Sequence, residues 1–203
     1  EETVTYRRSN AFAVVAAECK AVRASVGVME ASGYGRFMVE GPDAEAFLNK
    51  VMANRAPELG RMALTPMLNP KGRLIGDLTI GRIGPETYFL VGSSIAEKFY
   101  LRWFERQSGD MRVTVRSLLP EQVGLAIAGP KSRELLARLT RSDVSNAVFP
   151  FLSIARMEIG LVSAIVGRVS FTGELGYELW VAPDQQRALH DAVREAGRDL
   201  GLV

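Results

Sequence analysis

The sequence predicts an α+β fold made of two copies of one unit, each with a strand, a helix, an antiparallel hairpin and a second helix. Two observations support this prediction. A short apolar strand ends in Gly-Pro at Gly41-Pro42 and again at Gly129-Pro130. After each Gly-Pro, apolar residues recur at helical spacing, and two strand-like segments and a further helical segment follow in the same order.

Local patterns set the elements of each copy. Proline cannot continue a strand and suits the first turn of a helix, so each Gly-Pro ends a strand and begins a helix. The other expected elements are strands near 79–83 and 88–91 with a helix over 94–107 in the first copy, and strands near 165–169 and 178–181 with a helix over 184–200 in the second.

The seam between the copies is expected near Leu118 and Pro120. This divides the chain into a first subdomain, 1–118, which includes an N-terminal helix, and a second subdomain, 119–203. Paired units often enclose a ligand groove where they meet. The chain begins with Glu1 and stops at Val203, so we expect a fragment of a longer protein whose second subdomain is incomplete at its C-terminal end.

Composition excludes several classes of protein. Of the 203 residues, 47% are hydrophobic and 24% are charged, as in an ordinary soluble domain, and the net charge is only +2. No basic stripe suggests a nucleic-acid partner, and no apolar run approaches the roughly 18 residues of a membrane helix. The single cysteine, Cys19, is expected to be buried in a protein of the reducing cytoplasm. The single histidine, His190, is expected at the surface, and a histidine-rich metal site is excluded.

Familiar cofactor and nucleophile motifs are missing. The stretch Gly33-Tyr34-Gly35 lacks the third glycine of a dinucleotide fingerprint and precedes a strand. The sequence also contains no Walker A motif and no GxSxG nucleophile elbow. The segment therefore cannot bind FAD or NAD through a Rossmann fingerprint.

Acidic side chains occur at two unusual places. Glu174 and Glu178 fall in a glycine-framed turn between apolar strands, with Tyr177 beside them. Asp77 lies inside an apolar strand, where an unpaired buried carboxylate would cost several kcal/mol. Each group is either a solvated surface feature or part of a polar ligand site, and the residues alone leave both interpretations open.

A combination of stretches carries a family resemblance. The segment Thr-Gly-Glu-Leu-Gly-Tyr-Glu at 172–178, preceded by Met-Leu-Asn-Pro-Lys-Gly at 67–72 and Asp-Leu at 77–78, resembles the tetrahydrofolate-binding aminomethyltransferase family. That family includes the T-protein of the glycine cleavage system and the folate-binding parts of dimethylglycine and sarcosine dehydrogenases. The resemblance runs from Tyr6 to Val203 and is strongest to the dehydrogenase branch, through the stretches 5–10, 64–69 and 103–105.

The resemblance implies a truncated T-protein-like fold, a site and a reaction. It makes Asp77 the catalytic carboxylate and implies that tetrahydrofolate is held by Glu174, Tyr177, Glu178, Tyr34, Val91, Ser93 and Asn69. The partners would be the folate and a one-carbon unit from a small methylated amine. In the dehydrogenase branch FAD would belong to a domain outside this chain. Departures from the T-protein pattern occur at Gly76, Gly81, Ser93 and Phe171.

Three functions remain open at this point. The first is one-carbon transfer to folate as part of a dimethylglycine or sarcosine dehydrogenase-like enzyme. The second is a T-protein-like aminomethyltransferase or a folate-dependent demethylase. The third, from another class, is a folate-binding scaffold without catalysis. Against all three stands an α+β domain whose acids are merely solvated.

Overall fold

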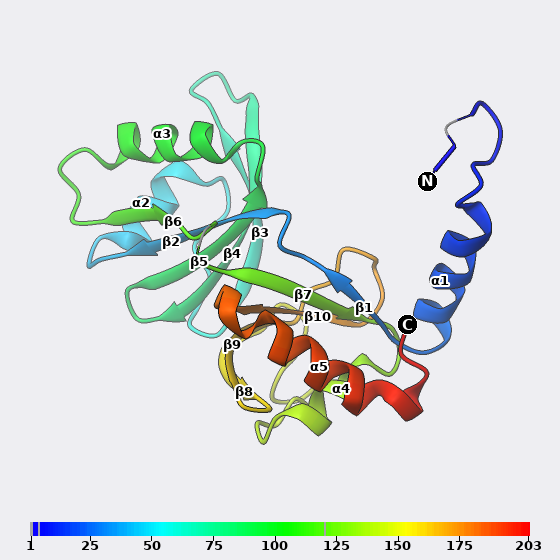
Figure 1. Ribbon diagram of the computed structural model, residues 1–203. Coiled ribbons are helices and arrows are strands. Elements are labelled where there is room, and N and C mark those ends of the chain that lie inside the picture. The colour runs from blue at the N-terminus through cyan, green and yellow to red at the C-terminus, as the bar shows by residue number, and fades with distance from the viewer. Residues whose placement is uncertain (1, 4, 120) are drawn as a thin grey trace.

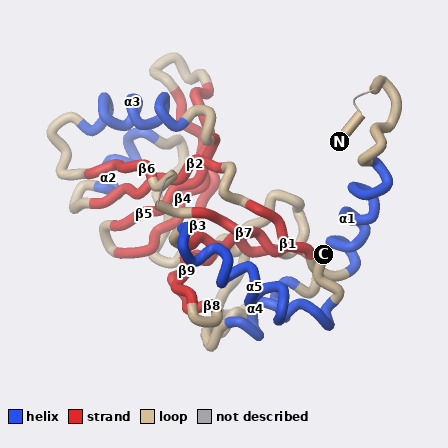
Figure 2. The backbone as a smooth tube through the Cα atoms, viewed as in Figure 1, coloured by secondary structure: helices blue, strands red, loops and turns tan. Residues whose placement is uncertain are grey.

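The computed structural model describes residues 2–3, 5–119 and 121–203, so Pro120 of the expected seam lies outside the described residues. Two antiparallel sheets form its centre, and helices cover the outer face of each (Figures 1 and 2). The first sheet has the order β3 (Met62–Leu68), β4 (Leu74–Gly84), β5 (Thr87–Ser93), β2 (Tyr34–Glu40) and β6 (Thr114–Ser117), with α2 (Ala44–Val51) and α3 (Glu97–Ser108) against it. The predicted α+β class is confirmed.

The second sheet repeats this order. It runs β8 (Ile154–Ile159), β9 (Val162–Gly167), β10 (Gly176–Val181), β7 (Val123–Ala128) and β1 (Gly27–Glu30), and α4 (Ser132–Leu139) and α5 (Gln186–Gly197) pack on it. Short 3-10 helices, η1 (Pro183–Gln185) and η2 (Arg198–Leu200), flank α5. The two sheets therefore have the same strand order, as expected of a duplicated unit.

The fifth strand of each sheet is exchanged between the units. β1 leads along the chain into β2 of the first sheet but pairs with β7 of the second. β6 leads into β7 but pairs with β2. A boundary at residue 118 therefore leaves β1 in the N-terminal segment although it belongs to the C-terminal sheet.

The two Gly-Pro turns mark the same place in each unit. Gly41 and Gly129 have φ angles of +132° and +128°, a region that side chains disfavour. A Cβ atom at Gly41 would come within 2.3 Å of the Arg112 carbonyl oxygen, and one at Gly129 within 2.4 Å of the Ser25 carbonyl oxygen. Both carbonyls belong to the segments that lead into β6 and β1, so glycine lets each turn pack closely on the backbone that precedes the fifth strand of its own sheet.

Strand alternation separates three groups of apolar side chains. One group lies between the first sheet and its helices, and a second lies between the second sheet and its helices. The third group joins the inner faces of the two sheets and consists of Met38, Met62, Phe89, Leu118, Ile154, Ile165 and Trp180. The Phe89 and Trp180 rings meet there with centroids 4.8 Å apart. These inner faces are therefore the surfaces on which a site between the units can form.

The structure corrects two expectations from the sequence. Cys19 is exposed, because it lies on α1 (Phe12–Ala24), a helix that buries none of its residues and stands apart from the sheets in Figure 1. The expected turn at 171–178 is shorter, because β10 begins at Gly176 and takes in Tyr177 and Glu178 through its pairing with β7. In the described part of the chain, none of the helices has the length and hydrophobicity needed to cross a bilayer.

Candidate functional site

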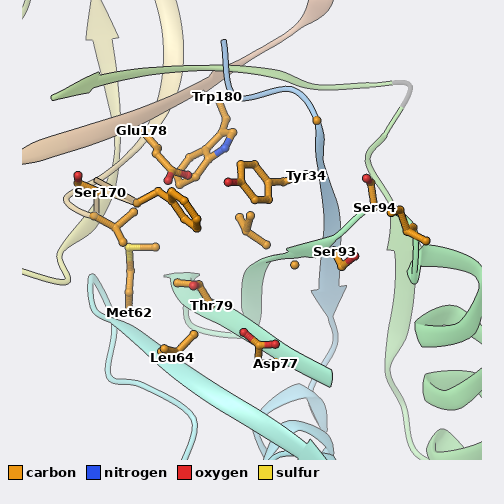
Figure 3. A pocket seen from close by; sticks show the side chains of 16 residues that line it. Tyr34, Met62, Leu64, Asp77, Thr79, Ser93, Ser94, Ser170, Glu178 and Trp180 are labelled. Carbon is orange, nitrogen blue, oxygen red and sulfur yellow. The ribbon is translucent and has the colours of Figure 1, made fainter. Parts of the chain in front are cut away.

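A cavity of about 500 Å³ opens between the inner faces of the two sheets. Figure 3 shows its lining side chains converging from β3, β4 and β5 of the first sheet and from β10 and the preceding loop of the second. Its polar lining includes Asp77, Thr79, Ser93, Ser94, Ser170 and Glu178, and its apolar lining includes Met62, Leu64, Val91, Ile95, Phe171 and Trp180. Such a mixture of apolar walls and a few polar groups is typical of small-molecule sites.

Strand alternation decides which side chains enter the cavity. On β10, Glu178 and Trp180 point inward, whereas Tyr177 and Leu179 lie in the core beneath α4 and α5. On β4, Asp77 lines the cavity while Leu78 faces the other core. Because successive side chains of a strand point to opposite faces, neighbours in sequence have separate environments.

Glu178 is the most perturbed group of the cavity. Removal from water raises the pKa of its carboxyl from 4.5 to about 7. Within the described residues its side chain makes neither a hydrogen bond nor an ion pair. A smaller recess of about 110 Å³, shared with Tyr34 and Ser170, adjoins it. Glu178 is thus a half-buried acceptor whose hydrogen-bonding capacity is free for a ligand.

Asp77 lies on the opposite wall of the cavity, as Figure 3 shows. Its side chain is exposed and likewise makes no hydrogen bond or ion pair within the described residues. Burial and, to a smaller extent, the charge of Asp77 raise the pKa of the nearby Tyr100 phenol. A Cβ atom at Gly76 would lie 2.4 Å from the Tyr100 hydroxyl oxygen, so this tyrosine occupies the space that an acid at position 76 would need.

The remaining expected ligand contacts divide into two groups. Tyr34, Val91 and Ser93 line the cavity, as Asp77 and Glu178 do. Glu174, Tyr177 and Asn69 are absent from its lining.

Each residue of the second group is engaged elsewhere. Glu174 sits in the loop before β10 and pairs with Arg23 at 3.7 Å. The Tyr177 ring is fully buried against Phe149, and its hydroxyl has no partner in the described structure. The Asn69 side chain accepts hydrogen bonds from the backbone of its own turn. These three side chains therefore lie outside the lining of this cavity.

Several residues that line the cavity were not predicted from the sequence. Thr79, Ser170 and Trp180 belong to no recognised polar cluster, yet all three line the cavity. Thr79 lies two positions after Asp77 on β4, and Trp180 lies two positions after Glu178 on β10. Because side chains two positions apart on a strand share a face, strand alternation could have identified both as lining residues. Within the described residues, no three His, Cys, Asp or Glu side chains gather closely enough to hold a metal ion.

Comparisons with known proteins agree with this architecture. The model of the GCVT N-terminal domain matches residues 1–203. Human mitochondrial dimethylglycine dehydrogenase is 34% identical over 200 residues, which cover 98% of this chain and 23% of the dehydrogenase. An aminomethyltransferase of Halothermothrix orenii is 33% identical over 190 residues, covering 92% of this chain and 52% of the relative. The chain thus spans about a quarter of one relative and half of the other.

Two solved structures share the fold. The glycine cleavage system aminomethyltransferase T from Bartonella henselae matches 92% of this chain and 49% of its own, with a TM-score of 0.77 and 22% identity. A chain of the heterotetrameric sarcosine oxidase from Corynebacterium sp. U-96 also matches, and the match covers 98% of this chain and 98% of that one, with a TM-score of 0.71 and 17% identity. With the family model matching along its whole length, this chain belongs to the GCVT N-terminal domain family.

Proposed function

We propose that the chain binds tetrahydrofolate in the cavity between its sheets and serves as a folate-dependent one-carbon transfer domain. The observation that carries the proposal is the convergence of Asp77 and Glu178, from different sheets, on one cavity in a member of this family. Relatives with more than 30% identity are named as enzymes, an aminomethyltransferase and a dimethylglycine dehydrogenase, which favours catalysis over a scaffold role.

The chemistry of the lining suits a reduced pterin. Its amino-pyrimidinone ring is flat, and the edge of that ring presents N–H donors side by side. An ionised Glu178 can accept two parallel hydrogen bonds from that edge, and charge-assisted bonds of this kind are strong. Val91, Met62 and Trp180 offer apolar surface for the ring faces.

Asp77 is suited to the reacting end of the ligand. When bound, the folate supplies the nitrogen atoms that accept the one-carbon unit. From the opposite wall of the cavity, Asp77 can stabilise a cationic amine-derived group and take up the proton that transfer releases. Ser93 lies on the neighbouring strand and lines the same cavity, so it can help to orient the group.

The relatives also suggest which kind of longer enzyme this chain belongs to. We favour a dimethylglycine or sarcosine dehydrogenase-like enzyme, because the human dehydrogenase matches almost the whole of this chain. The one-carbon donor would then be a small methylated amine, and FAD would be carried outside this chain. The T-protein-like reaction stays the alternative. The cytoplasmic location stays a prediction from cysteine usage, whereas the human relative is mitochondrial by name.

Calorimetric titration with tetrahydrofolate, combined with a one-carbon transfer assay, tests the proposal. Glu178→Gln should weaken binding, because an amide can accept only one of the two hydrogen bonds and carries no charge. Asp77→Asn should keep most of the affinity but slow transfer by roughly a hundred- to ten-thousand-fold, the usual contribution of a general acid or base.

Glu174→Gln is the matched control. It removes an acid from the same sequence motif but outside the cavity, so binding and transfer should stay at the wild-type level. The proposal fails if tetrahydrofolate does not bind, or if Glu178→Gln and Glu174→Gln bind it equally well.

A further inference from the structure

The helix α1 leaves apolar side chains in contact with water along its whole length. Only three of its 13 residues carry a charge, and none of the 13 is buried. Phe12, Val14 and Val15 are 46%, 61% and 50% exposed. Figure 1 shows the helix standing apart from both sheets, with one end beside the C-terminus. A helix that is apolar on most sides is normally buried, so α1 is a candidate contact surface.

A groove of about 570 Å³ follows α1 and lies far from the cavity between the sheets. Five of its lining residues come from the helix and one comes from the segment beside it; they are Ala13, Val14, Ala17, Glu18, Ala21 and Val203. Only Glu18 among them is polar, so the groove suits an apolar occupant. At about 1.5 Å per residue, the stretch from Ala13 to Ala21 is roughly 12 Å long, or about two helical turns.

Both walls of the groove are fixed to the second sheet. Ser25, directly after α1, donates a hydrogen bond from its hydroxyl to the Leu200 carbonyl oxygen. On the other wall, the Val203 N–H donates to the Val26 carbonyl oxygen at 3.2 Å, and the Val203 carbonyl oxygen accepts from the Val28 N–H at 2.8 Å. The helix is therefore tied down at its C-terminal end, and the groove beside it has a defined place in the fold.

We propose that α1 is a docking element whose groove is filled by an apolar segment of the parent enzyme from outside residues 1–203. This inference rests on the proposed function, which makes the chain part of a longer dehydrogenase-like enzyme. The apolar segment would pack on Val14 and on the alanine side chains of the groove, and it would remove them from water. Docking at α1 would then hold the folate domain in a fixed position against the rest of the enzyme.

The size of the groove and the length of the relatives select this occupant. A stable complex of separate chains takes about 20–30 residues on each side, whereas six residues line the groove. So small a contact is effective within one polypeptide, because covalent linkage keeps the two parts at a high local concentration. The match with human dimethylglycine dehydrogenase covers 23% of that relative, so an enzyme of its kind has ample further polypeptide to supply the segment.

Amide hydrogen exchange, read by mass spectrometry, tests the inference on the 203-residue chain and on the full parent enzyme, both without folate. In the 203-residue chain α1 should exchange quickly, because the helix buries none of its residues. In the parent enzyme α1 should exchange at least about tenfold more slowly. The helix α5 is the internal control, because it already packs on the second core and should exchange at similar rates in both proteins.

Val14→Glu separates the groove from other causes of protection. In the 203-residue chain it should leave the melting temperature unchanged, because the side chain is exposed and an acid suits the first turn of a helix. In the parent enzyme it should abolish the slow exchange of α1, because a carboxylate would be forced into an apolar contact. Leu161→Glu, at a fully exposed position between β8 and β9, is the matched control and should keep the slow exchange.

Equal exchange of α1 in the two proteins overturns the inference. Slow exchange that survives Val14→Glu overturns the groove as the contact. Slow exchange in the 203-residue chain that grows with protein concentration overturns it too, because a second copy would then cover the helix. Since no folate is added, these outcomes leave the proposed function standing. Failure of tetrahydrofolate to bind in the calorimetric titration would overturn that function whatever the exchange rates.

Discussion

Glu178 and Tyr177 are neighbours on β10, but their side chains point to opposite faces of the sheet, one into the cavity and the other into the core. Both lie in the segment that identifies the family, and the sequence marks both as candidates. In the structure only Glu178 faces the cavity, while the Tyr177 ring packs on Phe149. Burial raises the pKa of both side chains, but only the Glu178 carboxyl is placed where a ligand can reach it.

The raised pKa of Glu178 predicts a pH dependence of stability. The folded protein holds the proton more tightly than the unfolded chain, so the contribution is fully present below pH 4.5 and is lost as the pH rises through about 7. A rise from 4.5 to about 7 corresponds to about 3 kcal/mol. Urea unfolding should therefore show the wild type losing up to about 3 kcal/mol relative to Glu178→Gln between pH 4 and pH 8.

Acids with lowered pKa values do not disturb this comparison. Arg112 and Arg138 lower the pKa values of Asp43 and Asp199, so those pairs lose stability only as the pH falls through these lowered values. That loss is common to both proteins and cancels in their difference. A difference that stays constant from pH 4 to pH 8 would show that Glu178 is not desolvated.

At the scale of elements, Arg36 on β2 links the two chain segments that pass from one sheet to the other. This side chain is almost fully buried, and its guanidinium donates to the carbonyl oxygens of Ser32 at 3.0 Å and Gln122 at 2.8 Å. Ser32 lies between β1 and β2, and Gln122 lies between β6 and β7. Arg36 therefore ties together the two connections that exchange strands, beside the part of the chain that brings Gly33 and Tyr34 to the cavity.

Arg36→Met should destabilise the fold markedly. The change removes two hydrogen bonds and leaves two carbonyl groups without a donor, a loss of about 2–4 kcal/mol in the free energy of unfolding. Arg116→Met on β6 is the control, because the ion pairs of Arg116 with Glu40 and Glu121 are exposed and should contribute less than about 1 kcal/mol. Chemical denaturation measures both, and equal effects would contradict the role assigned to Arg36.

At the scale of the whole molecule, the two halves of the chain differ in whether they contain all the strands of their own sheet. The first sheet lies wholly within residues 1–118, whereas the second sheet takes β1 from that half. Val26, just before β1, is a fully buried member of the second core. We propose that the two subdomains are interlocked units, in which the C-terminal half depends on the N-terminal one.

Separate expression of 1–118 and 119–203 tests this dependence. The N-terminal piece should retain β-sheet signal and a cooperative unfolding transition. The C-terminal piece should lack such a transition alone and gain it on mixing with the N-terminal piece. Circular dichroism with thermal unfolding measures both, and a cooperatively folded 119–203 piece would contradict the interlocked arrangement.

The sequence predicts the duplication but not the exchange, and the reason is physical. The Gly-Pro turns and helical spacing are local signals, so the order of elements along the chain in each unit follows from them. β1 and β6 are only four residues long each, and their partners are distant in sequence, so no local pattern reveals their pairing. Similarly, Asn69 lies in a stretch that resembles the family, but its side-chain oxygen accepts hydrogen bonds within a turn that lies outside the cavity lining.

The proposed function depends above all on Asp77 and Glu178 contacting one bound folate ring from opposite walls of the cavity. A crystal structure of the protein with tetrahydrofolate tests this arrangement most directly. We expect the amino-pyrimidinone edge within hydrogen-bond distance of the Glu178 carboxylate and the reactive nitrogens on the Asp77 side. A ring bound elsewhere, with both carboxylates facing water, would contradict the proposed function.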